Sequence, residues 1–445
     1  MMIESRKPGH GVYRWIVFLL LAAGYVLVNF HRLCPAVVAL DLMRDLQAGG
    51  SLVGILASAY FYPYAFMQIP SGLLADSWGP RKTITSFFLL AGIASIGFGL
   101  APTAGAAIGA RVLVGIGVSM YFVPVMKILT RWFTVAEFSF MTGWMIAAGG
   151  LGALTAATPL ACLSAAFGWR GCFILIGAVT LATAGAIWIL VRNHPAELGY
   201  SAPTATSLPP GQPEVDMGLW RAIHSVATSF RFWPLALWYF FNFGIFYSFG
   251  GLWGGPFLME IHQLSKPRAG AILSMMALGM MIGSPICGYL SDHVLRSRKK
   301  VLVLAAFCTF LLSLALWYLG GRFTVFWLYM WCFLLGLFSC SAAVVGFAAV
   351  KESFPVRITG TAMGLVNVFP FLGGALMQPA VGLILDWYGK NPAGYPLAAY
   401  RSAFGLYLLS ALFALVSTCF VHETFPAAPA KSQETGAKDQ GSTGS

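Results

Sequence analysis

The stretch Gly72-Leu-Leu-Ala-Asp76-Ser-Trp-Gly79-Pro-Arg81-Lys82 lies between two long apolar runs of the chain. It places a carboxylate, glycines and a basic pair at the point where one hydrophobic segment should leave a bilayer and the next should enter it. The stretch therefore predicts a short connection at a membrane surface.

A second version of this stretch, Gly288-Tyr-Leu-Ser-Asp292-His-Val-Leu-Arg296-Ser-Arg298-Lys299-Lys300, follows in the later part of the chain. Asp76 and Asp292 are 216 residues apart in a chain of 445. A repeat at about half the chain length predicts two related halves, as in many membrane proteins that are built by duplication.

The composition excludes a water-soluble domain, because 58% of the residues are hydrophobic and only 9% are charged. Several separate runs of about 20 apolar residues are each long enough to cross a bilayer as a helix. We therefore predict an all-α membrane protein with twelve transmembrane helices in two pseudo-symmetric six-helix bundles. The spans are expected near 13–38, 52–74, 82–101, 104–127, 138–161, 170–191, 232–257, 268–290, 300–319, 323–349, 358–385 and 401–421.

These spans divide the chain into an N-terminal bundle at 1–191, a cytoplasmic linker at 192–231, a C-terminal bundle at 232–425 and a tail at 426–445. The linker is rich in proline, and a short amphipathic helix is expected around Leu219–Val226. The polar tail is expected to be disordered. Prolines within the spans should kink them, namely Pro35, Pro63, Pro124, Pro159, Pro285 and Pro370.

The net charge of +12 reflects membrane topology rather than nucleic-acid binding. With twelve spans, 18 of the 27 basic residues fall on the side that holds both termini, and seven fall on the opposite side. Basic residues stay where the chain is not translocated. We therefore expect a multi-pass protein of the cytoplasmic membrane, with both termini in the cytoplasm and lipid as its surroundings.

The sequence contains no pattern that indicates a metal site, another cofactor or an enzyme. Its eight cysteines lie mostly in apolar runs, without a Cys-x-x-Cys pair, and behave as small hydrophobic residues. It offers no nucleophile–base set and no phosphate-binding loop. A monomer without cofactors is expected.

The Gly72–Lys82 stretch resembles the loop signature of the major facilitator superfamily, Gly-x-Leu-x-Asp-x-x-Gly followed by Arg or Lys. The second copy has Leu295 where the pattern has its later glycine. The resemblance implies the two-bundle fold, transport by alternating access and a gating role for both loops. The gating residues are then Gly72, Asp76, Gly79, Arg81 and Arg131 in the first half, and Gly288, Asp292 and Arg296 in the second.

Asp76 stands at the predicted cytoplasmic end of a span. It can accept hydrogen bonds from the N-terminus of a neighbouring helix and pair with Arg81 or Arg131. The resemblance implies that this contact helps to hold an outward-facing state.

Arg32 is the most informative single residue, because an ionised guanidinium about twenty residues into an apolar span is expensive in lipid. Tyr25, Asn29 and Arg32 are spaced i, i+4, i+7 and therefore share one helix face. Such a polar stripe would suit an anionic substrate, since arginine offers paired donors to a carboxylate or phosphate. Alternatively, Arg32 extends beyond Pro35 to the outer interface.

Two other basic residues in the spans could couple transport to protons. His31 can titrate near neutral pH, or it can be a packed histidine. Arg111, in Arg111-x-x-x-Gly115-x-Gly117, resembles a signature of the fourth span in proton-coupled members, and its alternative role is an anchor at the outer interface. No carboxylate stands near the centre of a predicted span.

Further polar or aromatic residues could line the same site, or they could serve only in packing. Tyr60 and Tyr64 share one face of the second span with Gln68. An amide in hydrocarbon needs a partner, which favours the two asparagines over the tyrosines. The candidates in the other spans are Tyr121, Tyr239, Asn242 and Asn367, with Gln378 beyond them.

The first span, Gly24-Tyr25…Arg32, also resembles that of the organophosphate/phosphate exchange family, which includes sugar-phosphate permeases. In that family a second arginine lies in the seventh span, where this sequence has Phe249, and a histidine lies in the fifth, where it has Ala148. With one cation in place of two, a singly charged anion such as a monocarboxylate or a sugar acid is favoured.

Together these features predict a secondary transporter for a small organic anion, coupled to protons or working by exchange. An exporter of amphipathic compounds is one alternative, although no acidic residue for a cationic substrate is evident. A membrane sensor of a sugar-phosphate-like ligand is the other.

Overall fold

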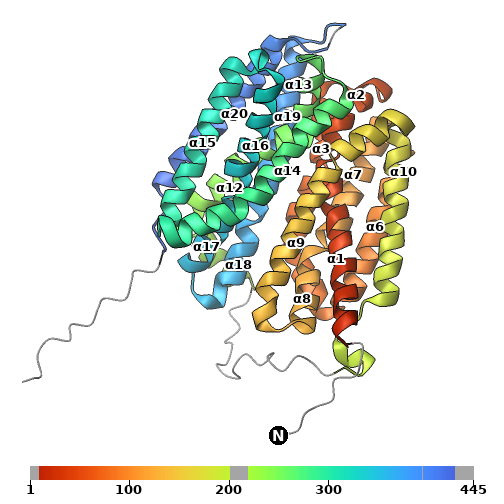
Figure 1. Ribbon diagram of the computed structural model, residues 1–445, viewed down its shortest axis with the longest axis vertical. Coiled ribbons are helices and arrows are strands. Elements are labelled where there is room, and N and C mark those ends of the chain that lie inside the picture. The colour runs from red at the N-terminus through yellow and green to blue at the C-terminus, as the bar shows by residue number, and fades with distance from the viewer. Residues whose placement is uncertain (1–9, 201–218, 393, 426–445) are drawn as a thin grey trace, which may run out of the picture.

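The computed structural model describes residues 10–200, 219–392 and 394–425, which are almost entirely helical (Figure 1). The expected disordered tail and most of the linker lie outside the described residues. Two groups of helices stand side by side in Figure 1, one from each half of the chain.

The first half runs from α1 to α10 and alternates long helices with short ones. Its elements are α1 (His10–Leu33), α2 (Pro35–Asp45), α3 (Gly50–Ser58), α4 (Phe61–Phe66), α5 (Gln68–Ser77), α6 (Pro80–Gly99), α7 (Ala104–Ser119), α8 (Phe122–Trp132), α9 (Val135–Thr155) and α10 (Thr158–Leu190).

The described part of the linker holds η1 (Pro195–Leu198) and α11 (Leu219–Ala227), which covers the expected amphipathic helix. The second half follows with α12 (Phe232–Ser248), η2 (Phe249–Trp253), α13 (Gly254–Glu260), α14 (Lys266–Tyr289), η3 (Leu290–Val294), α15 (Arg298–Leu319), η4 (Gly320–Arg322), α16 (Val325–Leu335), η5 (Gly336–Cys340), α17 (Ala343–Ser353), α18 (Val356–Val366), α19 (Val368–Tyr388) and α20 (Leu397–Cys419).

Several helix breaks lie just before prolines of the predicted spans. Thus α1 ends one residue before Cys34-Pro35, α7 and α8 meet ahead of Pro124, and α18 gives way to α19 ahead of Pro370. Proline lacks the amide hydrogen and clashes with the preceding turn, so the helix is interrupted upstream of its ring. Pro285 instead remains inside α14.

In the described residues, ten helical segments are long and apolar enough to cross a membrane, and a pair bent by 55°, Gly50–Phe66 with Pro70–Ser77, adds an eleventh. The end at which α1 begins and α10 finishes is here called the linker end, and the other the opposite end.

The segment Phe140–Leu190 has 51 residues and makes two passes. It starts beyond Glu137, which pairs with Arg14 near the start of α1 at the linker end. It reaches the opposite end at Trp169, whose indole donates to Asp45 at the end of α2. Its last residue, Leu190, accepts a hydrogen bond from Tyr13, again at the linker end. The turn is at Gly168, whose φ of 70° and ψ of 160° are not helical, so the chain crosses twelve times, as predicted.

The two halves are held together toward the opposite end. Asp386 of α19 accepts hydrogen bonds from the backbone amides of Gly50 and Ser51, at 2.7 and 2.8 Å. Lys266 forms an ion pair with Asp41 across the same boundary. In Figure 1 the two groups of helices diverge toward the linker end.

Candidate functional site

Arg32 lies in the interior of the protein, close to the plane where the two halves meet. Its side chain comes from the last turn of α1 and the residue is only 7% exposed. The guanidinium carbon is 4.9 Å from the centre of the Tyr64 ring in the first half and 5.1 Å from that of Phe371 in the second. This position differs from an extended side chain at the outer interface, which was the alternative.

The predicted polar stripe on α1 is connected by hydrogen bonds. Arg32 Nη1 donates to Asn29 Oδ1 at 3.2 Å, and Asn29 Nδ2 donates to the carbonyl of Tyr25 at 3.0 Å. Arg32 Nε is buried without a partner in the described structure. Asn29 therefore positions the guanidinium and leaves part of its donor capacity unused.

Arg111 supplies a second buried guanidinium next to the first. It is 1% exposed, and its Nη1 donates to the carbonyl of His31 at 2.8 Å. Its guanidinium carbon is 5.0 Å from the ring of Tyr60, which stacks on Tyr64 at 5.7 Å. The site thus has two cations instead of one, and the second comes from α7 rather than from the seventh span, where Phe249 stands.

These two positive charges have no neighbouring counter-charge in the described chain. Neither arginine forms an ion pair there, and the buried atoms without hydrogen-bond partners include Nε of both and Nη2 of Arg111. Aromatic faces offset part of the cost of burying a guanidinium, by about 0.5 to 2 kcal/mol each. An anion would supply the rest of the compensation.

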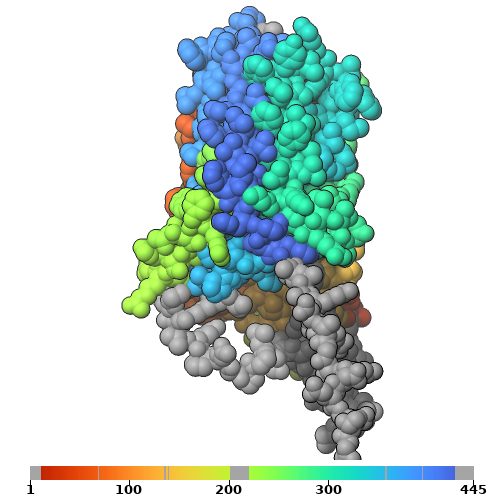
Figure 2. All heavy atoms as spheres, turned by 90° about the vertical axis from the view of Figure 1, so that its left-hand side faces the viewer, coloured from red at the N-terminus to blue at the C-terminus, as the bar shows by residue number. Residues whose placement is uncertain are grey.

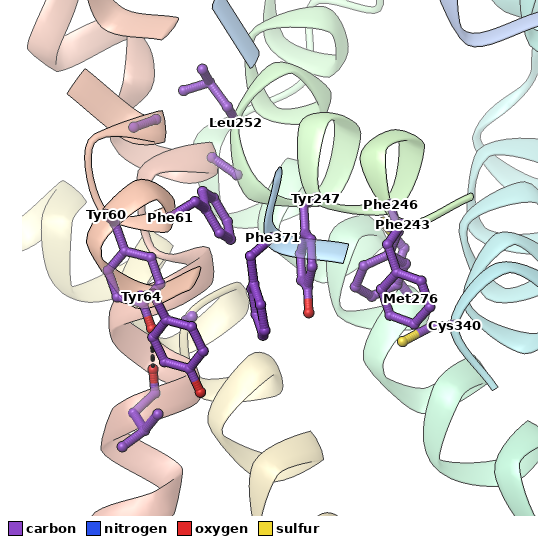
Figure 3. Packing of buried hydrophobic residues seen from close by; sticks show 14 of the residues in the cluster. Tyr60, Phe61, Tyr64, Phe243, Phe246, Tyr247, Leu252, Met276, Cys340 and Phe371 are labelled. Atoms are coloured by element: carbon purple, nitrogen blue, oxygen red, sulfur yellow. Dashed lines mark hydrogen bonds between the residues drawn. The ribbon is translucent and has the colours of Figure 1, made fainter. Parts of the chain in front are cut away.

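Aromatic side chains from both halves surround this cationic centre. Figure 3 shows Tyr60, Phe61 and Tyr64 facing Phe371 and Tyr247. The ring centres of Tyr64 and Phe371 are 4.4 Å apart, and those of Phe371 and Tyr247 are 5.9 Å apart. The hydroxyls of Tyr64 and Tyr247 point to the side on which Tyr60 donates to the carbonyl of Val28. We call these five residues the aromatic cluster.

Tyr247 and Phe371 are not among the residues that the sequence singles out. A signal for Tyr247 was present, because Tyr239, Phe243 and Tyr247 recur at i, i+4, i+8 in α12. Phe371 follows the proline that precedes its turn of α19, and nothing in its own sequence distinguishes it from the other 34 phenylalanines.

The remaining candidates lie in packing positions of the bundles. The hydroxyl of Tyr121 donates to Leu21 in α1 at 2.9 Å, and that of Tyr239 donates to Ala343 at 2.7 Å. Asn242 donates to the carbonyl of Ser339 at 3.2 Å, while its Oδ1 is buried without a partner in the described residues. Asn367 is half-buried at the break between α18 and α19.

His31 is buried on the side of α1 away from the aromatic cluster. Its Nε2 lies 3.3 Å from the hydroxyl of Thr180 in α10, and its carbonyl holds Arg111. It therefore links three helices, whatever its protonation.

The first gating loop has a different ion pair from the one expected. Asp76 pairs with Lys127 of α8, while Arg81 stacks on Trp188 at 4.3 Å. The reason is geometric, because α5 packs against α8, whereas Arg81 belongs to α6 and turns toward α10. Arg131 is half-buried and forms no ion pair with the described residues.

Glycine has distinct roles in this loop. Gly79 has a φ of 93°, which favours glycine, and it begins the turn into α6. Gly72 and its counterpart Gly288 have no neighbouring atom within 4 Å of the place where a side chain would begin.

In the second gating loop, Arg298 takes the role expected of Arg296. Arg298 pairs with Asp292 and, at 2.9 Å, with Glu352 of α17. Arg296 has a φ of 44° and forms no ion pair among the described side chains. The insertion of a π-helical turn, η3, shifts the register and places Arg298 next to the acid.

The fold and this site define a two-bundle helical membrane protein with a cationic centre between its halves. The family model of the Major Facilitator Superfamily matches residues 15–254 and again residues 235–442. The chain therefore belongs to this superfamily of membrane transporters.

Individual relatives are more distant. A probable sulfoacetate transporter of Cupriavidus necator is 31% identical over 168 residues, which cover 38% of this chain and only 39% of the relative. A probable hexose phosphate transport protein of Chlamydia trachomatis is 24% identical and spans 86% of this chain and 88% of its own length. A probable galactarate/D-glucarate transporter of Escherichia coli is 23% identical, over 84% and 88% of the two chains.

A solved structure supports the same fold. The inward-facing, unoccupied bacterial homolog of the human lysosomal transporter Spinster superposes with a TM-score of 0.71 at 18% identity, over 94% of this chain and 97% of that one.

Proposed function

We propose that this protein is a secondary transporter that carries a small organic anion across the cytoplasmic membrane by alternating access. The observation that carries the proposal is the pair of buried guanidiniums, Arg32 and Arg111, without a carboxylate beside them in the described residues. A site of this kind attracts an anion and repels a cation. The relatives named for sulfoacetate, sugar diacids and hexose phosphates, all of them anions, support this class.

The favoured substrates are sugar acids and other small carboxylates. Arg32 binds the carboxylate, and the aromatic cluster packs against the rest of the molecule. The second cation, Arg111, admits substrates with two negative charges as well as those with one.

We further propose that the described conformation opens toward the linker end, which is the cytoplasmic side. The hydrogen bonds and ion pairs between the halves lie toward the opposite end, while Asp76–Lys127 and Arg298–Glu352 each stay within one half. Substrate would enter or leave past Tyr25 and Tyr64.

The test of the proposal is flux into proteoliposomes that contain the purified protein. Uptake of labelled glucarate, galactonate, sulfoacetate and a hexose phosphate is compared for the wild type and for Arg32→Gln, with Arg44→Gln as the control. Arg44 is also an arginine, but its side chain is 75% exposed at the opposite end. We expect at least one of these anions to be transported, with a loss of about 100-fold in Arg32→Gln and little change in Arg44→Gln, because a lost charge-assisted pair costs about 3 kcal/mol. Full transport by a folded Arg32→Gln protein would refute the role of Arg32.

The same vesicles distinguish exchange from proton coupling. We favour exchange, because the described spans place no carboxylate beside the two arginines to carry a proton. Preloading the vesicles with unlabelled substrate should then accelerate uptake several-fold, and a pH gradient imposed on empty vesicles should not. The reverse result would establish proton coupling.

A further inference from the structure

The basic residues at the opposite end deserve an accounting, since few of them occur there. Four of the seven have partners in the protein. Lys266 and Arg44 contact Asp41, and Lys390 contacts Glu260 at 4.0 Å. Arg170 donates to two carbonyls that follow α6. The other three are Arg268, Arg322 and Arg401, and none of them has an ion pair with the described residues.

Arg322 and Arg401 share one cavity. The cavity has a volume of about 280 Å³ and lies where α15 and η4 finish and α20 begins. Aromatic and aliphatic residues form its walls, among them Trp317, Tyr318 and Leu397. The guanidinium carbon of Arg401 is 5.1 Å from the Trp317 ring and 5.7 Å from the Tyr318 ring. The cavity thus combines two unpaired cations with an aromatic wall.

This cavity is separate from the cationic centre around Arg32. It belongs to the second half alone, and α15 and α20 lie side by side on the face that is turned away from the first half (Figures 1 and 2). Large apolar side chains are exposed around it, with Tyr318 at 62% and Leu397 at 45%. Exposed aromatic residues at the ends of membrane helices mark the headgroup region of a bilayer.

We propose that this cavity binds the headgroup of an anionic phospholipid. The phosphodiester lies between Arg322 and Arg401, because guanidinium groups donate paired hydrogen bonds to phosphate oxygens. The acyl chains run along the exposed surface beside Tyr318 and Leu397. Basic pockets between membrane helices are suited to such headgroups. A soluble anion would gain the two charges but would leave this apolar surface without a partner.

The experiment is native mass spectrometry of the purified full-length protein, titrated with phosphatidylglycerol or phosphatidylcholine in detergent. The wild type should retain one phosphatidylglycerol about tenfold more tightly than phosphatidylcholine. The double variant Arg322→Gln/Arg401→Gln should lose that difference, since each lost charge-assisted contact weakens binding about tenfold. Arg268→Gln is the matched control, and it should bind like the wild type. Arg32→Gln should also bind like the wild type, which keeps this test independent of transport.

Two further measurements decide the nature of the ligand. Soluble glycerophosphoglycerol should bind far more weakly than the lipid, and equal binding would overturn the lipid assignment in favour of a free-anion site. Unchanged phosphatidylglycerol binding by the double variant would overturn the site itself. If the double variant does not fold, the single variants Arg401→Lys and Arg401→Gln replace it, with binding expected to decrease in that order and equal binding by both contradicting the role of Arg401.

Discussion

Tyr60 and Tyr64 each present a ring to one buried arginine, and they stack on each other. A guanidinium within a membrane span is costly unless water, a partner or an anion stabilises it. Here each cation has an aromatic face and one hydrogen bond, to Asn29 or to the carbonyl of His31. The remaining donors make the centre selective for negative charge.

The tyrosine hydroxyls separate substrate contacts from packing contacts. That of Tyr64 has no hydrogen-bond partner among the described residues, whereas that of Tyr121 is bound to Leu21. We expect Tyr64→Phe to raise the apparent KM about fivefold, because one hydrogen bond of about 1 kcal/mol to the anion is lost. Tyr121→Phe should instead lower the Tm and leave KM unchanged. Flux measurements over a range of substrate concentrations check both, and an unchanged KM in Tyr64→Phe would exclude its hydroxyl from binding.

At the scale of helices, the contact between α19 and α3 resembles a latch. Asp386 accepts hydrogen bonds from two amides at the N-terminus of α3 and from the hydroxyls of Ser51 and Tyr395. A carboxylate is well placed there, because a helix N-terminus carries partial positive charge. An opposite end that opens in the transport cycle must break these bonds.

We therefore expect Asp386→Asn to favour opening of the opposite end. Cys34, fully buried just beyond Arg32, is a native reporter of that opening. Its labelling by a membrane-impermeant thiol reagent, followed by mass spectrometry, should be about tenfold faster in the variant. Asp45→Asn is the control, since Asp45 contacts Trp169 and Arg44 within the first half only. Equal labelling in both variants would argue against the latch.

The start of α9 gives a prediction about pH. Thr134 and Glu137 form a capping box, and Arg14 pairs with Glu137 at 2.9 Å. Hydrogen bonds from Thr134 and then from Arg14 hold the pKa of Glu137 below its usual value, although partial burial opposes this. A lowered pKa means that the stabilisation is complete above the unfolded pKa, about 4.3, and is lost as the pH falls through the folded pKa.

Glu137→Gln should therefore lower the Tm by about 2 °C at pH 7, which corresponds to about 1 kcal/mol for a lost cap. The difference from the wild type should shrink as the pH falls below about 5. Thermal unfolding at pH 7, 5 and 4 measures it. A difference that persists unchanged at pH 4 would show that the charge of Glu137 is not responsible.

At the scale of the whole molecule, transport requires that the two halves separate at the opposite end. Thr158 in α10 and Ser274 in α14 meet across this boundary, with their hydroxyls 2.7 Å apart. A disulfide between Thr158→Cys and Ser274→Cys should hold the halves together, since the positions are close enough to be bridged. Oxidation should abolish flux, and reduction should restore it. Each single variant should transport with or without oxidant, and undiminished flux in the cross-linked protein would contradict alternating access.

The sequence alone determined the class of fold and several local groupings. Apolar runs of membrane length define the spans, because a bilayer accepts only closed backbone hydrogen bonding. Helical spacing placed Tyr25, Asn29 and Arg32 on one face, since 3.6 residues per turn fix that relation without reference to the rest of the chain. The repeat of the gating loop divided the chain into halves for the same kind of reason.

Only the tertiary structure decided which helices meet. Arg111 lies beside His31, Lys127 pairs with Asp76, and Phe371 covers Arg32, although each of these contacts joins residues from different spans. Periodicity within one helix gives no information about the rotation of its neighbour, so the second cation could not be located from its own segment. Packing between helices set that rotation, and with it the composition of the site.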